Sequence, residues 1–285
     1  MRLGRIAWVN CFPVYGAIDR GVISLDAELV DGVPSVLNAH MAAGTLDVSV
    51  ISAVEYARDA NRYLLLPDLA ISCDGPVRSV MLFTKRPASD LSGRRVLVSR
   101  SSMTSVALLE LLFESVWDSK PTFVPADAEL TDIAHFGSDD HDARLVIGDA
   151  ALRLGAHLQD MGVRDQLMDR LGYRYAYDLG AVWKGWTDLP FVFAVWVAQR
   201  TTDTRAALNV HAGLMASRTW GLKHLETLSA QAALATGVPK NSCLTYLSGL
   251  DYGLSYGHLA GLTEFFRRLV AGGKVPDGSL SFLAA

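Results

Sequence analysis

Cysteine is scarce in this chain, and the few cysteines present form no recognisable framework. The 285 residues include Cys11, Cys73 and Cys243, an odd number with no C-x-x-C spacing. A disulfide scaffold and a zinc ribbon are therefore both excluded as the basis of the fold. Thiols used in this way are usually inert packing, and unpaired cysteines favour a reducing compartment, the cytoplasm.

Long apolar runs and an export signal are also missing. Residues 1–9 carry two arginines, but neither an apolar stretch of signal-peptide length nor a small-residue cleavage site follows them. The longest apolar run, residues 189–198, contains Pro190 and is about half of what would span a bilayer. We therefore expect neither export nor membrane insertion.

The chain has no excess of positive charge. Its 26 Lys and Arg residues are outnumbered by 30 Asp and Glu residues, which gives a formal net charge of −4. Without a basic stripe, neither a nucleic acid nor an anionic membrane is expected as a partner. Half of the residues are apolar, which suits a large core in one large domain or two ordinary ones.

Short strand patterns alternate with helical patterns through the first third of the chain. We predict strands at residues 5–9, 27–30 and 48–52, and helices at residues 34–43 and 54–61. Such a rhythm is typical of an α/β fold with parallel strands.

A polar segment at residues 85–93 separates this unit from a second one. The α/β pattern restarts at residue 95 and runs to about residue 189, and the chain is almost wholly helical in pattern from residue 204. Two apolar strands, at residues 80–84 and 191–198, would cross between the units. The pattern thus predicts an α/β fold, a two-lobed clamp of the periplasmic-binding-protein type (type II) with two crossover strands and a helical C-terminal region. Residues 1–84 and 199–285 would form lobe 1, and residues 85–198 lobe 2. A single doubly wound sheet with a helical tail is the structural alternative.

An Asp-Gly-Pro turn stands directly before the apolar run that begins at Val80. A turn followed by a buried strand can hold backbone N–H groups and hydroxyls rigidly toward a small ligand. We expect this segment to form one wall of a binding site, to which it would contribute Cys73, Asp74, Gly75, Val77 and Ser79.

Other small polar residues end predicted strands or begin predicted helices. Residues 99–105 precede a helix, so their N–H groups and hydroxyls could grip a carboxylate, although plain N-capping explains them equally well. Asn10 ends the first predicted strand, where asparagine also commonly closes a turn. Gly148 and Asp149 follow a buried strand, where they would line the site or form an N-cap. The remaining candidate ligand contacts are Ser52, Ser101, Ser102, Thr104 and Ser105.

Six segments, taken in order, resemble the motif series of the chorismate dehydratases of the futalosine route to menaquinone. These segments are WVNCFP (8–13), ISAVEY (51–56), SCDGPV (72–77), LVIGDAAL (145–152), YDLG (177–180) and LPFVFAVW (189–196). The resemblance covers roughly residues 5–198, and the helical tail matches less distinctly.

The resemblance implies a carbon–oxygen lyase that dehydrates chorismate, a dianion, to 3-[(1-carboxyvinyl)oxy]benzoate and needs no cofactor and no metal. It places Asn10 at the motif position linked to catalysis and favours Ser79 as a second catalytic residue. The matched motifs contain no obvious strong base apart from Glu55, which follows a strand. We therefore expect the enolpyruvyl carboxylate of the substrate to take the proton, while Asn10 and Ser79 hold the reacting conformer. Downstream enzymes of the pathway are candidate partners.

Other functions stay open at this point. The sister naphthoate-forming enzyme of the same pathway is the nearest alternative, and the SCDGP signature argues for the dehydratase. A non-catalytic small-anion-binding protein on the same clamp would normally carry an export signal, and an effector-binding regulator would carry a helix-turn-helix. GLSYG (253–257) fits the G-x-S-x-G pattern of hydrolases, but no predicted strand precedes it, so we interpret it as a turn between helices.

Overall fold

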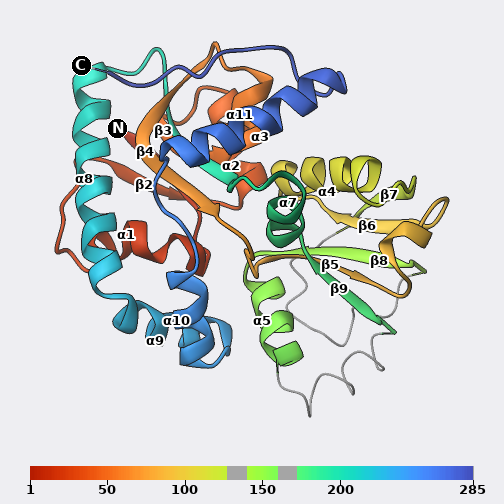
Figure 1. Cartoon of the computed structure of the whole chain (residues 1–285). Coiled ribbons are helices and arrows are strands. Elements are labelled where there is room, and N and C mark those ends of the chain that lie inside the picture. Colours follow the sequence, from red (N-terminus) through yellow and green to blue (C-terminus); the bar gives the residue numbers. More distant parts are fainter. Residues whose placement is uncertain (127–139, 160–171, 285) are drawn as a thin grey trace.

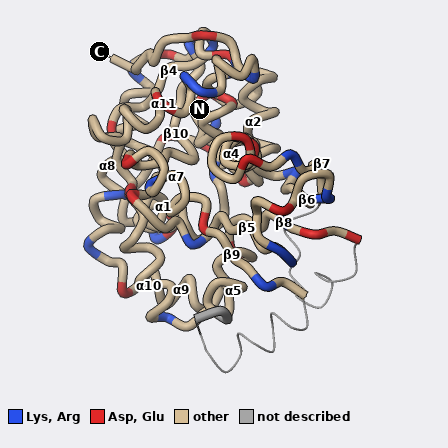
Figure 2. Tube along the Cα trace, turned by 45° about the vertical axis from the view of Figure 1, so that its right-hand side comes forward, with Lys and Arg blue, Asp and Glu red and all other residues tan. Residues whose placement is uncertain are grey.

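The chain forms two lobes, each built on a five-stranded sheet, within the residues that the computed structural model describes, 1–126, 140–159 and 172–284 (Figure 1). Both chain ends lie in the first lobe. The two-lobed α/β architecture predicted from the sequence is thereby confirmed. Acidic and basic residues are interspersed over both lobes in the view of Figure 2. In the described part of the chain, no helix is long and apolar enough to cross a membrane.

The first sheet has the strand order β2-β1-β3-β10-β4. Its first three strands are parallel, and β10 runs antiparallel between β3 and β4. Every residue of β3 is buried, because helices cover both faces of this sheet. The strands are β1 (Arg2–Arg5), β2 (Glu28–Asp31), β3 (Val48–Ser52), β4 (Tyr63–Cys73) and β10 (Phe191–Gln199).

The second sheet has the order β7-β6-β8-β5-β9. Strands β6, β7 and β8 are parallel, and β5 pairs antiparallel with both β8 and β9. The carboxyl ends of β1 and β3 in one lobe and of β6 and β8 in the other are the places where βα loops can present ligand groups. The strands are β5 (Val80–Thr84), β6 (Arg95–Ser99), β7 (Thr122–Ala126), β8 (Ala143–Ile147) and β9 (Tyr175–Asp178).

Helices cover both sheets, and most of the helices after β10 belong to the first lobe (Figure 1). The helical stretch expected from residue 204 is broken at His224, which separates α8 from α9. The helices are α1 (Phe12–Asp19), α2 (Pro34–Ala42), α3 (Ala53–Arg58), α4 (Met103–Ser115), α5 (Gly148–Gln159), α7 (Leu179–Thr187), α8 (Thr204–Lys223), α9 (Leu225–Thr236), α10 (Lys240–Ser248) and α11 (Tyr256–Ala271), with short 3₁₀ turns η1 (Val9–Cys11) and η2 (Ala88–Asp90).

The first predicted strand, residues 5–9, is wrong. The strand ends at Arg5, and residues 9–11 form the 3₁₀ turn η1. Ile6 and Val9 are buried, but in the loop after the strand rather than on alternate faces of a sheet. Burial in a loop produced an apolar pattern that looked like a strand.

The lobes are joined by two hinge connections, residues 74–79 between β4 and β5 and residues 179–190 between β9 and β10. The two expected crossover strands each lie within one sheet: β5 pairs in the second sheet and β10 in the first. The chain therefore changes sheet before Val80 and before Phe191. As limits of separately folding domains, residues 84 and 198 stay a prediction.

Two glycines of α7 test how closely the hinge connections pack. A Cβ on Gly180 would lie 2.6 Å from the Gly75 carbonyl oxygen and 2.7 Å from the Cys73 sulfur, whereas a Cβ on Gly185 would meet open space. We expect Gly180→Ala to lower the free energy of unfolding by about 1–3 kcal/mol through overpacking. Gly185→Ala should raise it by about 0.5–1 kcal/mol through helix propensity. Urea unfolding measures both, and equal stabilisation by the two variants would contradict this packing.

Candidate active site

A small cavity of about 50 Å³ lies where the two lobes meet. Its walls come from the loop after β1, the ends of β3 and β8, the first hinge connection, the start of α4 and strand β10. The described residues that line it are Ile6, Trp8, Asn10, Pro34, Ser52, Ile71, Val77, Ser79, Val80, Ser102, Ser105, Ile147, Gly148, Phe193 and Ala194.

Many of the residues singled out from the sequence converge on this cavity. They come from both lobes and are separated by up to 138 positions in the chain (residues 10 and 148), and they meet because the βα loops of each lobe face the gap. The predicted residues in the lining are Asn10, Ser52, Val77, Ser79, Ser102, Ser105 and Gly148. Their roles toward a ligand stay predictions.

Asn10 is the most telling of these side chains. Its amide oxygen is shielded from solvent and has no hydrogen-bond partner in the described part of the chain. A buried acceptor left unpaired costs about 1–3 kcal/mol. Such an atom in the wall of a cavity is therefore suited to accept a hydrogen bond from a ligand.

Ser52 is oriented by a residue that sequence reasoning missed, the buried Asn38 of α2. Asn38 Nδ2 donates to Ser52 Oγ at 3.1 Å, and Asn38 Oδ1 accepts from the Ser52 N–H at 3.1 Å. Since the Ser52 oxygen already accepts a bond, its hydroxyl proton is left to donate into the cavity. Asn38 stands inside a helical pattern, so no sequence signal set it apart.

In the segment at residues 101–105, Ser102 and Ser105 begin α4 and line the cavity, while their role toward a carboxylate stays a prediction. Ser102 Oγ caps α4 by accepting from the Ser105 N–H at 3.2 Å, and it donates to Ser105 Oγ at 2.9 Å. Ser102 is thus an N-cap, as one interpretation predicted, and it also lines the cavity. The Ser105 hydroxyl proton is left to donate, and the positive end of the α4 dipole points the same way.

Several predicted residues form hydrogen bonds elsewhere and lie outside the described lining. Thr104 Oγ1 accepts from the Val54 N–H at 3.2 Å, and the Ser101 N–H donates to Ser99 Oγ at 3.0 Å. Asp149 Oδ1 accepts from the Val9 N–H at 3.3 Å. The bonds of Thr104 and Asp149 join the two lobes and so contribute to holding them together.

The conspicuous residues of the Asp-Gly-Pro turn also lie outside the lining. Cys73 is buried, which raises the pKa of its thiol. The Asp74 carboxylate forms an ion pair with Lys184 at 2.9 Å, and Gly75 supplies a φ of 117° that glycine adopts without strain. These three residues shape the turn, while Val77 and Ser79 reach the cavity.

The hinge turn is held in place by Asp178, which was part of a matched motif but not a predicted site residue. Asp178 Oδ1 accepts from the N–H groups of Val77 at 3.0 Å and Ala181 at 3.1 Å, and Oδ2 accepts from the Arg78 N–H at 2.7 Å. Arg78 has a left-handed φ of 61°, a conformation that costs free energy for a residue with a side chain. One carboxylate thus fixes the peptide groups on both sides of Val77, directly before the left-handed residue Arg78.

Ser79 is buried at the start of β5. Its hydroxyl lies 3.4 Å from the Val77 carbonyl oxygen, a long contact. Tyr246 of α10 lies close to Ser79, and burial raises the pKa of that tyrosine. The first lobe therefore touches the same serine from its C-terminal helices.

The described lining contains no ionisable side chain. Glu55, the one candidate base in the motifs, accepts from the Tyr63 hydroxyl at 3.2 Å and lies outside the lining. Burial raises the pKa of Glu55. Among the described residues, the cavity thus offers hydroxyls, one amide and N–H groups rather than a general base or a cation.

The G-x-S-x-G segment forms a helix cap, as its interpretation as a turn suggested. Ser255 is the N-cap of α11 in a capping box with His258, and His258 Nε2 lies 3.2 Å from Asp251 Oδ2. The Ser255 hydroxyl and N–H both contact His258 Nδ1, at 2.9 and 3.2 Å. These bonds serve the start of the helix, and no strand leads into the serine as a nucleophile elbow requires.

The Asp149 carboxyl predicts a distinctive pH dependence. Burial raises its pKa from 3.8 to about 6, so the folded state binds this proton more tightly than the unfolded chain. Its contribution to the free energy of unfolding therefore falls as the pH rises from about 4 to about 6 and is constant above that. Asp149→Asn cannot ionise and keeps an oxygen for Val9, so the variant should gain stability relative to the wild type across this window.

Urea unfolding between pH 3 and pH 7 measures this difference. Asp31→Asn is the control of opposite sign, because the hydrogen bond from Arg5 lowers the pKa of Asp31. Asp31 stabilises the fold above the pKa of the unfolded chain, so its variant should lose relative stability as the pH rises through that value. A difference for Asp149→Asn that does not change with pH would refute the assignment.

Comparison with known proteins agrees with the fold. Solved structures of the same fold include a protein from Archaeoglobus fulgidus, with a TM-score of 0.78 and 18% identity over 96% of this chain and 98% of that one. They also include the alkanesulfonate-binding protein of Xanthomonas axonopodis pv. citri, with a TM-score of 0.66 and 15% identity over 98% of this chain and 95% of that one. A Candida albicans protein with the generic periplasmic-binding-protein fold has a TM-score of 0.68 and 10% identity over 100% and 97% of the two chains. The clamp fold predicted from the sequence is thus confirmed.

Sequence comparison identifies the family. A chorismate dehydratase from Thermus thermophilus is 32% identical over 244 residues, which cover 85% of this chain and 86% of that protein. The sequence model of a family described as menaquinone biosynthesis matches residues 1–271. This match includes the helical tail, where the motifs were indistinct. The chain therefore belongs to the menaquinone biosynthesis family.

Proposed function

We propose that this protein is a chorismate dehydratase, a carbon–oxygen lyase that forms 3-[(1-carboxyvinyl)oxy]benzoate in menaquinone biosynthesis. Family membership and the Thermus thermophilus relative support the reaction. The observation that carries the proposal is the unpartnered amide oxygen of Asn10, which lies in a cavity that Ser79 also lines. Chorismate has a ring hydroxyl that can donate to such an acceptor and two carboxylates that accept from serine hydroxyls and N–H groups.

The chemistry needs a base that the described lining does not supply. Dehydration removes the proton from the ether-bearing ring carbon and expels the neighbouring hydroxyl, which leaves as water once it is protonated. In our proposal the enolpyruvyl carboxylate of the substrate takes the proton of the ring carbon and passes it to the departing hydroxyl, which leaves as water, and aromatisation of the ring drives the reaction. Asn10 and Ser79 orient the reacting conformer and form hydrogen bonds to the departing oxygen.

The substrate dianion would be held without a cationic side chain. The hydroxyls of Ser52 and Ser105 each have a proton to donate, because their oxygens are engaged by Asn38 and Ser102. The N-terminus of α4 adds the positive end of a helix dipole. Oriented neutral donors in a water-poor site can stabilise an anion at little reorganisation cost.

Admission of the substrate requires the lobes to separate. Sites for small molecules usually occupy about 300–1,000 Å³, whereas the cavity between the closed lobes holds about 50 Å³. The bonds that join the lobes include those from Val54 to Thr104 and from Val9 to Asp149, the bond from Arg153 to the Thr236 carbonyl oxygen and the Lys274–Glu110 ion pair. In our proposal these contacts break and re-form as the clamp opens.

Replacement of Asn10 by alanine tests the catalytic assignment. We expect kcat for chorismate to fall by about a hundredfold or more, because a group that stabilises the transition state is lost. The assay follows the aromatic enol-ether product. Asn209→Ala, an exposed position of α8, is the matched control and should keep full activity. Full turnover by Asn10→Ala would contradict the assignment of Asn10 as a catalytic residue.

Replacement of Asp178 by asparagine tests the hinge. The asparagine oxygen can still serve Val77 and Ala181, but its NH₂ group would face the Arg78 N–H, donor against donor. We expect kcat to fall by up to about a hundredfold, since Ser79 is displaced from its productive position.

Asp203→Asn is the matched control for Asp178. Asp203 also caps a helix, α8, by accepting from the Ala206 N–H at 2.8 Å, but it is exposed and is not among the described residues that line the cavity. Asparagine is an equally good cap, so activity should not change. If Asp178→Asn keeps its kcat, Asp178 serves only the helix and has no role in positioning Ser79.

The cytoplasmic location and any association with downstream enzymes stay predictions.

A further inference from the structure

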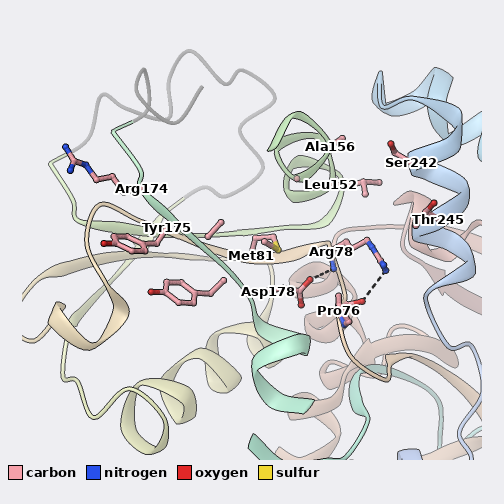
Figure 3. Close-up of a pocket in the computed structure, with 13 residues that line it drawn as sticks. Pro76, Arg78, Met81, Leu152, Ala156, Arg174, Tyr175, Asp178, Ser242 and Thr245 are labelled. Atoms are coloured by element: carbon pink, nitrogen blue, oxygen red, sulfur yellow. Dashed lines mark hydrogen bonds between the residues drawn. The ribbon is translucent and has the colours of Figure 1, made fainter. Parts of the chain in front are cut away.

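A second and larger cavity lies on the other side of the first hinge connection. This hinge groove, of about 550 Å³, is lined by Pro76, Arg78, Met81, Leu152, Tyr175 and Thr245, among others (Figure 3). Its walls come from β5, β9 and α5 of the second lobe and from α10 of the first lobe. Its volume falls in the range of about 300–1,000 Å³ that is usual for small-molecule sites.

In the described lining of the groove, two arginines outnumber one carboxylate. Neither Arg78 nor Arg174 has a carboxylate partner within the described residues, and Arg78 Nη1 makes only a long contact, 3.4 Å, to the Pro76 carbonyl oxygen. Asp178 is the one carboxylate in the described lining, and backbone N–H groups already occupy both of its oxygens. Arg78 is half-buried, so its guanidinium can offer a fork of donors to an anion.

The remaining lining suits an apolar body with a polar end. Met81 and Leu152 provide aliphatic surface, and Tyr175 provides an aromatic ring. On the opposite wall, α10 presents the hydroxyl-bearing residues Ser242 and Thr245 beside Arg78 (Figure 3). Carboxylate recognition by arginine and hydroxyls, next to an apolar patch, is the arrangement that an aromatic or alicyclic carboxylate requires.

We propose that the hinge groove is a second ligand site, which binds a small organic carboxylate with its charged end on Arg78 and its ring against Met81 and Leu152. The hinge backbone links this site to the small cavity: Val77 and Ser79 face the small cavity, while Pro76 and Arg78 face the groove. A ligand bound to Arg78 thus contacts the residue that lies between Val77 and Ser79, which both line the proposed active site. The binding itself does not rest on the proposed function.

Methionine methyl resonances can locate the ligand, because one methionine lies beside each cavity. Met81 lines the groove, and Met103 lies 3.3 Å from Asn38 Nδ2, close to the small cavity. Benzoate is the probe, and benzamide, its neutral counterpart, is the control. With ¹³C-methyl methionine, and Met81→Leu to assign the signal, we expect benzoate to shift the Met81 resonance saturably at millimolar concentrations. Benzamide should leave it unchanged. A shift at Met103 instead of Met81, or equal shifts with benzamide, would overturn the proposal.

A pair of charge-matched variants identifies the anchor. Arg78→Gln should weaken the binding of benzoate by about tenfold or more, the usual effect of losing hydrogen bonds to a charged group. Arg94→Gln removes the same charge at an exposed position outside the groove and should bind benzoate as the wild type does. Asn10→Ala should also bind normally, because Asn10 lies in the other cavity. Unchanged affinity in Arg78→Gln would overturn the proposal, and so would loss of binding in Asn10→Ala. Loss of activity in Asn10→Ala bears on the proposed function alone.

Discussion

The structure depends on one carboxylate, that of Asp178. It accepts three backbone N–H groups, two from the first hinge connection and one from the first turn of α7. Because α7 opens the second connection, this side chain joins the two crossings between the lobes to each other. It also holds Arg78 in a left-handed conformation, which lets neighbouring residues of a short turn point into different cavities. A bond network of this kind fixes geometry at the point where the chain crosses between the two lobes.

Close packing between the two hinge connections requires a glycine at position 180. Gly180 approaches the carbonyl of Gly75 and the sulfur of Cys73 so closely that a Cβ would overlap both. Cys73 is thus a small buried side chain beside Gly180, and burial disfavours its thiolate. The chemistry of the thiol matters less here than its size.

The proposed active site recognises charge with neutral groups. Two of the hydroxyls that line it are oriented by a second polar side chain: Ser52 by Asn38, and Ser105 by Ser102. Orientation by a neighbour removes the freedom that a lone serine would have, so donors already point at the cavity before a ligand arrives. In our proposal, the absence of an ionisable group from the described lining transfers the role of base to the substrate itself.

Much of this organisation could be predicted from the sequence, and the failures have physical causes. The alternation of strands and helices predicted two α/β lobes, and small polar residues after strands predicted Asn10, Ser52 and Gly148 in one cavity. Apolar periodicity failed at residues 5–9, because loop residues at the junction are buried like strand residues. It also missed β4, an eleven-residue strand that contains Pro67 and Asp68, since both residue types usually argue against a strand.

The roles of Asn38 and Asp178 could not be predicted from the sequence. Composition and spacing determined the fold class, the order of the elements and the loops that carry the polar groups, because these follow from local preferences and from the period of apolar residues. Only the tertiary structure decided that Asn38 orients Ser52, that Asp178 binds a turn a hundred residues earlier, and that Asp149 contacts the other lobe. Such contacts depend on how two sheets are placed across a hinge, and periodicity along the chain carries no record of that placement.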